Sequence, residues 1–166
     1  MTDRLLGALA PLFRYPDVDY HQHLAAARLR FRDREFEKFA GEMAALDLRE
    51  QQMAYTSTFD VAPSCSPYLG AHLFGEDMRD RARLMIGLRT TYESGARATS
   101  PASELPDHIA EVIDFADRYG DEEWRDLRRL VLLPALSRME EALSETANPY
   151  RHLIAATRHL TEGSGS

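Results

Sequence analysis

A cysteine and a histidine seven residues apart form the first pair in this sequence whose types could do chemistry. Cys65 and His72 stand in YTSTFDVAPSCSPYLGAHLFGE, residues 55–76. A thiol beside an imidazole base can act as a nucleophile. However, Cys65 lies between two serines in a loop bounded by prolines, and the sequence places no helix N-terminus beside it that would lower its pKa. We therefore interpret Cys65 as an ordinary loop thiol.

Acid and histidine residues four positions apart suggest a second chemistry, metal binding. Such pairs include Asp17 with His21, His72 with Glu76, and Glu104 with His108. Di-iron bundles use Glu-x-x-His instead, a motif that this chain lacks, and Gly75 or Pro106 interrupts the helix in two of these pairs. We interpret the pairs as chance spacings and assign no catalytic residue, metal or cofactor. A helical metalloprotein that uses His72, His108 and nearby acids is the alternative hypothesis.

The length and composition indicate one domain. The chain has 166 residues, which is enough to bury a core without disulfides. We expect a single helical domain over residues 1–162, with the closing GSGS, residues 163–166, a linker or tag. No apolar run of about 18 residues predicts a membrane span, and the N-terminus lacks the pattern of a signal peptide. We therefore expect the protein in the cytoplasm.

The negative charge is concentrated in one part of the chain. Residues 101–145 carry twelve acids and five arginines, whereas the remainder carries fifteen acids and fifteen basic residues. The whole net charge of −7 therefore lies in this third. Such a surface repels nucleic acid and anionic lipid and favours a cationic partner. The other interpretation is a solvated face that keeps the protein soluble.

Apolar residues recur at helical spacing through most of the chain, and no segment alternates as a strand does. About seven helices are predicted, within residues 5–13, 36–43, 48–59, 78–92, 106–120, 121–143 and 149–157. Pro11 and Pro134 should kink the helices that contain them. Asp121 is a candidate cap, and the small polar residues 96–103 predict a mobile loop. The fold class is therefore all-α.

Two blocks of residues resemble a known family. The first block runs from Tyr55 through FD, PYL and HLFGE to Gly95, and the second is ELPDHI, residues 104–109. In this order and separation they resemble the NarJ/TorD/DmsD family of molybdoenzyme assembly chaperones, over residues 5 to about 155. The Phe-Asp and His-x-x-Gly-Glu elements are closer to the NarJ-like branch. The resemblance implies a TorD-like helical bundle without catalysis of its own.

The resemblance also implies a partner. Members of this family bind the N-terminal peptide of an apo-molybdoenzyme catalytic subunit, such as that of nitrate reductase. They hold it until the molybdenum cofactor is inserted, before membrane attachment or export. We expect no nucleic acid partner, no direct membrane insertion, and a monomer or weak dimer. The resemblance implies these peptide-binding residues: Tyr55, Phe59, Tyr68, His72, Phe74, Glu76, Pro106, Asp107 and His108.

A molybdoenzyme targeting peptide is amphipathic and bears arginines, which suits an acidic protein with an aromatic groove. We expect the irregular segment 55–76 to form one wall of that groove and the acidic third, beginning at Pro106, to form the other. If Pro106 starts a helix, Asp107 and His108 lie in its first turn and point away from the core. Asp107 could then meet a client arginine, and His108 should be neutral there.

Overall fold

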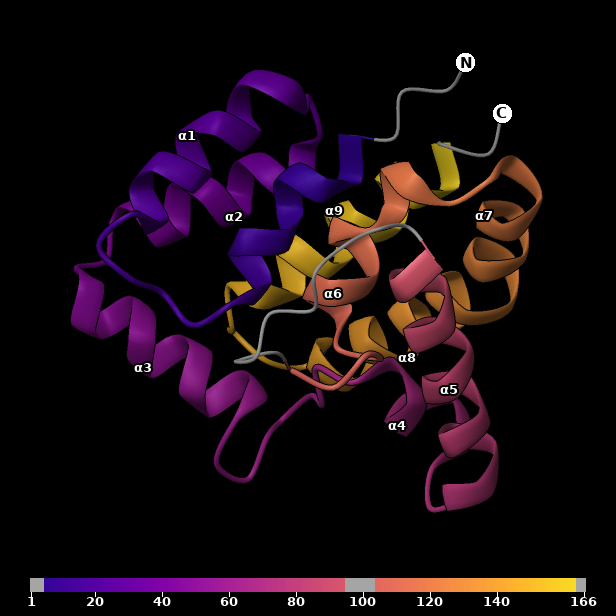
Figure 1. The fold of residues 1–166 in the computed structure, drawn as a ribbon. Helices are drawn as coiled ribbons and strands as arrows, with labels where there is room; N and C mark the ends of the chain where they lie inside the picture. Colours follow the sequence, from indigo (N-terminus) through magenta and orange to yellow (C-terminus); the bar gives the residue numbers. More distant parts are fainter. Residues whose placement is uncertain (1–4, 95–103, 164–166) are drawn as a thin grey trace.

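The computed structural model describes residues 5–94 and 104–163, and over these residues the chain forms nine α-helices and no β-strand (Figure 1). The predicted all-α fold is confirmed. The α-helices are α1 (Tyr20–Arg30), α2 (Arg34–Ala44), α3 (Leu48–Phe59), α4 (Leu69–Phe74), α5 (Met78–Ser94), α6 (Ile109–Asp114), α7 (Asp121–Leu127), α8 (Leu133–Leu143) and α9 (Tyr150–Gly163). The predicted loop 96–103 and the tail residues 164–166 lie outside the described residues.

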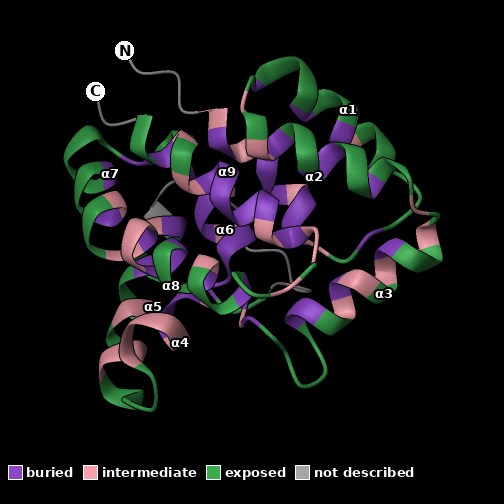
Figure 2. Ribbon diagram, turned by 180° about the vertical axis from the view of Figure 1, so that it is seen from behind, coloured by how far each residue is buried: buried purple, intermediate pink, exposed green. Residues whose placement is uncertain are grey.

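Helix α9 lies at the centre of the fold, where α2, α8 and the N-terminal 3₁₀ segment η1 (Leu5–Phe13) pack against it (Figure 2). Asn148 Oδ1 accepts a hydrogen bond from the Tyr150 amide at 2.9 Å, which satisfies an amide that the first turn leaves free. The helix begins at Tyr150, one residue after the predicted start at Pro149. Leu153 and Ile154 are fully buried, so α9 supplies the apolar face around which the core forms.

Segment η1 is helical, as predicted, but as a 3₁₀ helix with Pro11 inside it. Proline donates no amide hydrogen bond, so a regular α-helix is disfavoured at this point. Leu9 and Phe13 nevertheless reach the core, and η1 packs against α1 and α6.

The prediction of about seven helices missed α1 and α4. Helix α1 buries only Tyr20, Leu24 and Ala27, which is too few apolar residues for a clear period. Helix α4 has six residues, fewer than two turns, and lies inside the irregular segment.

The predicted helix over 121–143 is divided in two. A π-helical turn, η3 (Arg128–Leu132), separates α7 from α8, with the Leu133 amide bonded to the Arg128 carbonyl. This wide turn precedes Pro134, where a break was expected. The predicted cap at Asp121 is wrong by one residue: Gly120 is the N-cap, and Glu123 accepts its amide hydrogen at 3.2 Å.

Helices α3 and α5 lie at the edges of the molecule (Figure 1). Asp47 and Glu50 form a reciprocal capping box at the start of α3, with both hydrogen bonds at 2.8 Å. Helix α5 packs against α4, and among its described side chains only Leu88 and Tyr92 are buried. No helix of the described residues is both long enough and apolar enough to cross a membrane.

Candidate functional site

The two sequence blocks meet in direct backbone contact. The Leu69 amide donates to the Asp107 carbonyl and the Ile109 amide donates to the Pro67 carbonyl, each at 2.9 Å, which makes Tyr68 and His108 an isolated antiparallel bridge. From the sequence we expected these segments to form two opposed walls of a groove. In the structure the segments are joined by hydrogen bonds instead, and we call this contact the junction.

Asp107 lies at the buried centre of the junction. Its side chain is 0% exposed. Oδ2 accepts hydrogen bonds from Arg81 Nε at 3.0 Å and from the Gly70 amide at 3.1 Å. Oδ1 is buried and has no hydrogen-bond partner among the described residues. The ion pair therefore joins α5 to the junction through one carboxylate oxygen only.

This geometry corrects the expected placement of Asp107 and His108. The helix begins at Ile109 rather than Pro106, and His108 is its N-cap. Both side chains are buried, whereas we expected them to point away from the core. The physical reason is the pairing with Pro67–Leu69, which holds residues 107–109 extended and directs Asp107 to an internal arginine.

His108 is neutral, as expected, but for a different reason. Burial lowers its pKa to about 4, and Nδ1 accepts a hydrogen bond from the Ala110 amide at 3.1 Å. The ring proton therefore belongs on Nε2. The Tyr68 ring packs edge-on against the imidazole at 5.3 Å, and its hydroxyl donates to the exposed Glu104 at 2.7 Å. Tyr68 thus connects the buried junction to the surface.

Tyr55 and Phe59 are core residues. They are 8% and 5% exposed, and the Phe59 ring lies 4.9 Å from the ring of Tyr150 and 6.4 Å from that of Phe13. Burial raises the pKa of Tyr55 to about 12. The structure gives these two aromatics a packing role on the inner face of α3.

The outer face of α3 carries a cavity that the sequence analysis missed. Its volume is about 370 Å³. It is lined by Tyr15, Arg49, Gln52, Met53, Thr56, Ser57 and Val61. Tyr15, Met53 and Val61 are 55%, 62% and 75% exposed. The Tyr15 ring packs edge-on against Tyr55 at 5.7 Å, so the cavity adjoins the aromatic core. The α3 side of the cavity could have been inferred from the sequence, because residues 49, 52, 53, 56 and 57 share one face of the predicted helix.

A sequence model of the family described as nitrate reductase delta subunit matches residues 23–156. The chain belongs to this family. The resemblance to the NarJ family is thereby confirmed. A comparison with curated proteins found no match.

The fold of this NarJ-family protein is also found in a solved structure. The crystal structure described as that of a redox enzyme maturation protein from Archaeoglobus fulgidus superposes with a TM-score of 0.71. The match covers 96% of this chain and 93% of that chain at 21% sequence identity. At this identity the likeness concerns the fold alone.

The remaining predicted site residues of the NarJ-family protein are dispersed. His72 Nε2 lies 2.7 Å from the Ser66 carbonyl, and burial lowers its pKa. Phe74 is half-buried at the end of α4, and Glu76 is exposed beyond it. The Pro106 carbonyl accepts from the Tyr92 hydroxyl at 2.9 Å. Of the nine residues, only Tyr68, Pro106, Asp107 and His108 are brought together at the junction.

Cys65 should be unreactive in the native NarJ-family protein. It lies 4.0 Å from His72 Nε2, but burial raises its pKa to about 12, so almost none of it is thiolate at pH 8. We expect alkylation by iodoacetamide at pH 8 to be at least about 100-fold slower than in the urea-unfolded chain, given an ordinary thiol pKa of about 8.5. Mass spectrometry over time measures this. Rapid native labelling would instead indicate an activated thiol.

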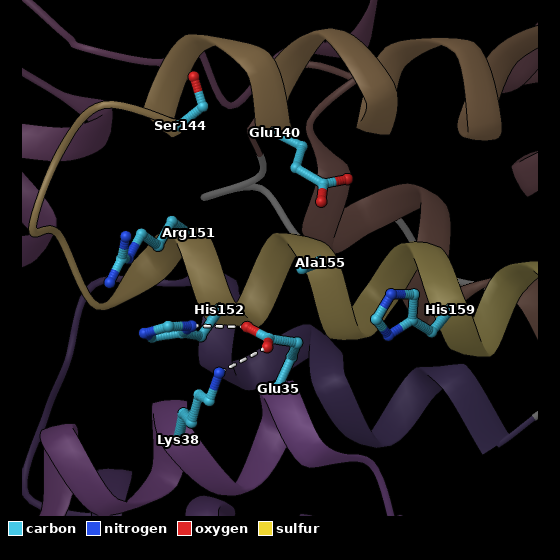
Figure 3. Close-up of a pocket in the computed structure, with 8 residues that line it drawn as sticks. All are labelled: Glu35, Lys38, Glu140, Ser144, Arg151, His152, Ala155 and His159. Atoms are coloured by element: carbon cyan, nitrogen blue, oxygen red, sulfur yellow. Dashed lines mark hydrogen bonds and ion pairs between the residues drawn. The ribbon is translucent and has the colours of Figure 1, made fainter.

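A second surface cavity of about 390 Å³ lies between α2, α8 and α9 (Figure 3). Glu35 accepts from His152 Nδ1 at 2.7 Å and from Lys38 at 2.9 Å, and these hydrogen bonds lower the pKa of Glu35. Glu140 pairs with Arg158 Nε at 2.5 Å. Both acids of the cavity therefore already have partners that join helices, and we assign it no ligand.

Metal coordination in the NarJ-family protein was the alternative hypothesis. Within residues 5–94 and 104–163, no three His, Cys, Asp or Glu side chains lie close enough to hold a metal ion. In this part of the chain His108 instead uses Nδ1 as the cap of α6.

Proposed function

We propose that this protein is a cytoplasmic chaperone that binds the N-terminal peptide of an apo-molybdoenzyme catalytic subunit. It assists insertion of the molybdenum cofactor before membrane attachment or export. Membership of the nitrate reductase delta subunit family supports a role in molybdoenzyme maturation. The observation that carries the peptide-binding part is the cavity along the outer face of α3, where the side chains of Tyr15, Met53 and Val61 are exposed.

The shape of this cavity suits a helical peptide. Five lining residues occupy consecutive turns of α3, and Tyr15, from the segment before α1, and Val61, from the segment after α3, complete the lining. An amphipathic helix binds such a groove through apolar side chains at positions i, i+3, i+4 and i+7. Met53 is suited to the role because its unbranched, polarizable side chain adapts to different partners.

Two exposed acids near the cavity would attract a peptide that bears arginines. The exposed acids Asp17 and Asp60 lie close in sequence to Tyr15 and Val61, respectively. Arg49 is the one charged residue in the lining. Exposed acids at these positions would steer a cationic peptide, against the opposing charge of Arg49, and would make its affinity fall as salt rises.

Substitution of Met53 tests the site. The probe is a synthetic copy of the N-terminal segment of the catalytic subunit that co-purifies with the protein. Met53→Asp places a charge against the peptide's apolar face, and we expect its Kd to rise at least about tenfold. Because Met53 is 62% exposed, the melting temperature should stay within a few degrees. Isothermal titration calorimetry measures the Kd.

Leu29→Asp is the matched control. Leu29 is 91% exposed on α1 and does not line the cavity, so its substitution should leave both stability and Kd unchanged. Equal affinity of the Met53 variant and the wild type would exclude the α3 cavity as the binding site.

A further inference from the structure

We propose that Arg81 is a specificity-determining residue: it occupies the Asp107 carboxylate in the free protein and yields that place to an arginine of the client peptide. This inference rests on the proposed peptide-binding function, and it adds a second contact for the same peptide, at the junction, to the one proposed at the α3 cavity. We had expected Asp107 to be exposed and free to bind a client arginine, and this inference replaces that expectation. The protein would instead recognise arginine by exchanging its own arginine for the client's.

The pairing of Arg81 with Asp107 is incomplete. A carboxylate and a guanidinium can form two parallel hydrogen bonds, but here one bond runs from Arg81 Nε to Oδ2. Oδ1 remains without a partner although it is buried. An unsatisfied buried acceptor raises the free energy of the state that contains it. A guanidinium placed to reach both oxygens would remove that cost.

The position of Arg81 also controls access to Asp107. Asp107 is 0% exposed, and the Gly70 backbone that bonds its Oδ2 is buried as well. The Arg81 side chain is 19% exposed, so of the two groups that hold Oδ2 it alone reaches solvent. A client arginine that replaced Arg81 would therefore enter along the space that Arg81 vacates.

The part of α5 that carries Arg81 contributes no fully buried side chain to the core. The buried anchors of α5, Leu88 and Tyr92, lie in the C-terminal half of the helix, and Tyr92 is fixed by its bond to the Pro106 carbonyl. In the N-terminal half, Met78 is 69% exposed and Leu84 is only partly buried against the core. Loss of the hydrogen bond between Arg81 and Asp107 would therefore loosen the N-terminal half of α5, while Leu88 and Tyr92 keep the C-terminal half packed against the core.

Tyr68 would make the same cation–π contact with the incoming arginine that it makes with Arg81. The Arg81 guanidinium lies 5.6 Å from the centre of the Tyr68 ring, within the range of a cation–π contact. The Tyr68 hydroxyl is hydrogen-bonded to Glu104 on the surface. A client guanidinium at Asp107 would therefore meet a carboxylate, an aromatic face and a second acid.

The test uses two peptides and two matched variants. The peptides are the synthetic client segment described above and a copy in which citrulline replaces every arginine, which keeps the shape and removes the charge. The variants are Arg81→Gln and Arg83→Gln. Arg83 is on the same helix but 74% exposed, and it lies 3.7 Å from the exposed Asp80. Calorimetry gives the dissociation constant of each variant for each peptide, and the wild type is measured with the same two peptides.

We expect Arg81→Gln to bind the arginine peptide about tenfold more tightly than the wild type does, with the citrulline peptide unchanged. Arg83→Gln should match the wild type for both. If Arg81→Gln changes both peptides by the same factor, the exchange is wrong and the proposed function stands. If no protein binds either peptide, the proposed function fails and the exchange fails with it.

A measurement on the wild type does not depend on the variant folding. The Arg81 side-chain Nε–H signal is assigned in ¹⁵N-labelled protein by its absence from Arg81→Lys. Saturation with the arginine peptide should move this signal to the position of a solvent-exposed arginine, and the citrulline peptide should leave it in place. A signal unmoved by saturating arginine peptide would overturn the exchange.

Discussion

Gly70→Ala should reduce the free energy of unfolding by roughly 3 to 5 kcal/mol, the cost of breaking a buried ion pair. A Cβ at position 70 would lie 2.6 Å from Asp107 Oδ2 and 2.7 Å from Arg81 Cγ. Neither distance is compatible with van der Waals contact, so the two partners must separate. The backbone of Gly70 is helical, so alanine brings no conformational strain and the loss reports the ion pair. Urea denaturation followed by circular dichroism measures it.

Gly87→Ala provides the control for Gly70. Gly87 is also helical, in α5, and a Cβ there would meet nothing within 4 Å. Alanine should therefore stabilise the protein by about 0.5 to 1 kcal/mol through helix propensity. If the two alanine variants were equally stable, the close packing at Gly70 would have no energetic consequence and the junction would not be a rigid unit.

Phe59→Ala should also lower the free energy of unfolding by about 3 to 5 kcal/mol, as expected for truncation of a buried aromatic ring. Phe59 is 5% exposed and its ring packs against those of Phe13, Tyr55 and Tyr150. Removal leaves a cavity where η1, α3 and the start of α9 meet. Urea denaturation again measures the loss, and peptide affinity per folded molecule should change little.

Met53→Ala separates this packing role from binding. Met53 lies on the same helix as Phe59 but is 62% exposed, so its truncation should change stability by less than about 0.5 kcal/mol while weakening peptide affinity. A Phe59→Ala variant of near-normal stability that had lost peptide affinity would restore Phe59 to the peptide-binding residues.

The helices that bury a full apolar stripe could be predicted from the sequence. Helix α2 shows this well, because Phe36, Phe39, Ala40 and Met43 recur at helical spacing and are all buried. Helix α1 buries only three residues, so its apolar residues showed no clear helical period and the helix was not predicted. The all-α class therefore followed from local periodicity, which needs no knowledge of tertiary contacts.

The candidate site depended on contacts that periodicity does not encode. Asp107 and Arg81 are 26 positions apart, and nothing in their local sequence distinguishes this pair from the other acids and arginines of an acidic chain. The burial of Asp107 follows from the pairing of Pro67–Leu69 with Asp107–Ile109. The α3 cavity likewise required three segments to be brought together.

The central position of α9 has a consequence for how the protein is made. Residues are added from the N-terminus on the ribosome, and domains fold as units when their chain has emerged. Tyr150, the first residue of α9, packs against Phe39, Tyr55 and Phe59. Until α9 has been synthesised, helices α2 and α3 therefore lack part of the core against which they pack. A nascent chain that stalls before α9 should remain sensitive to proteases, and the α3 surface should acquire its final shape only after α9 has been translated.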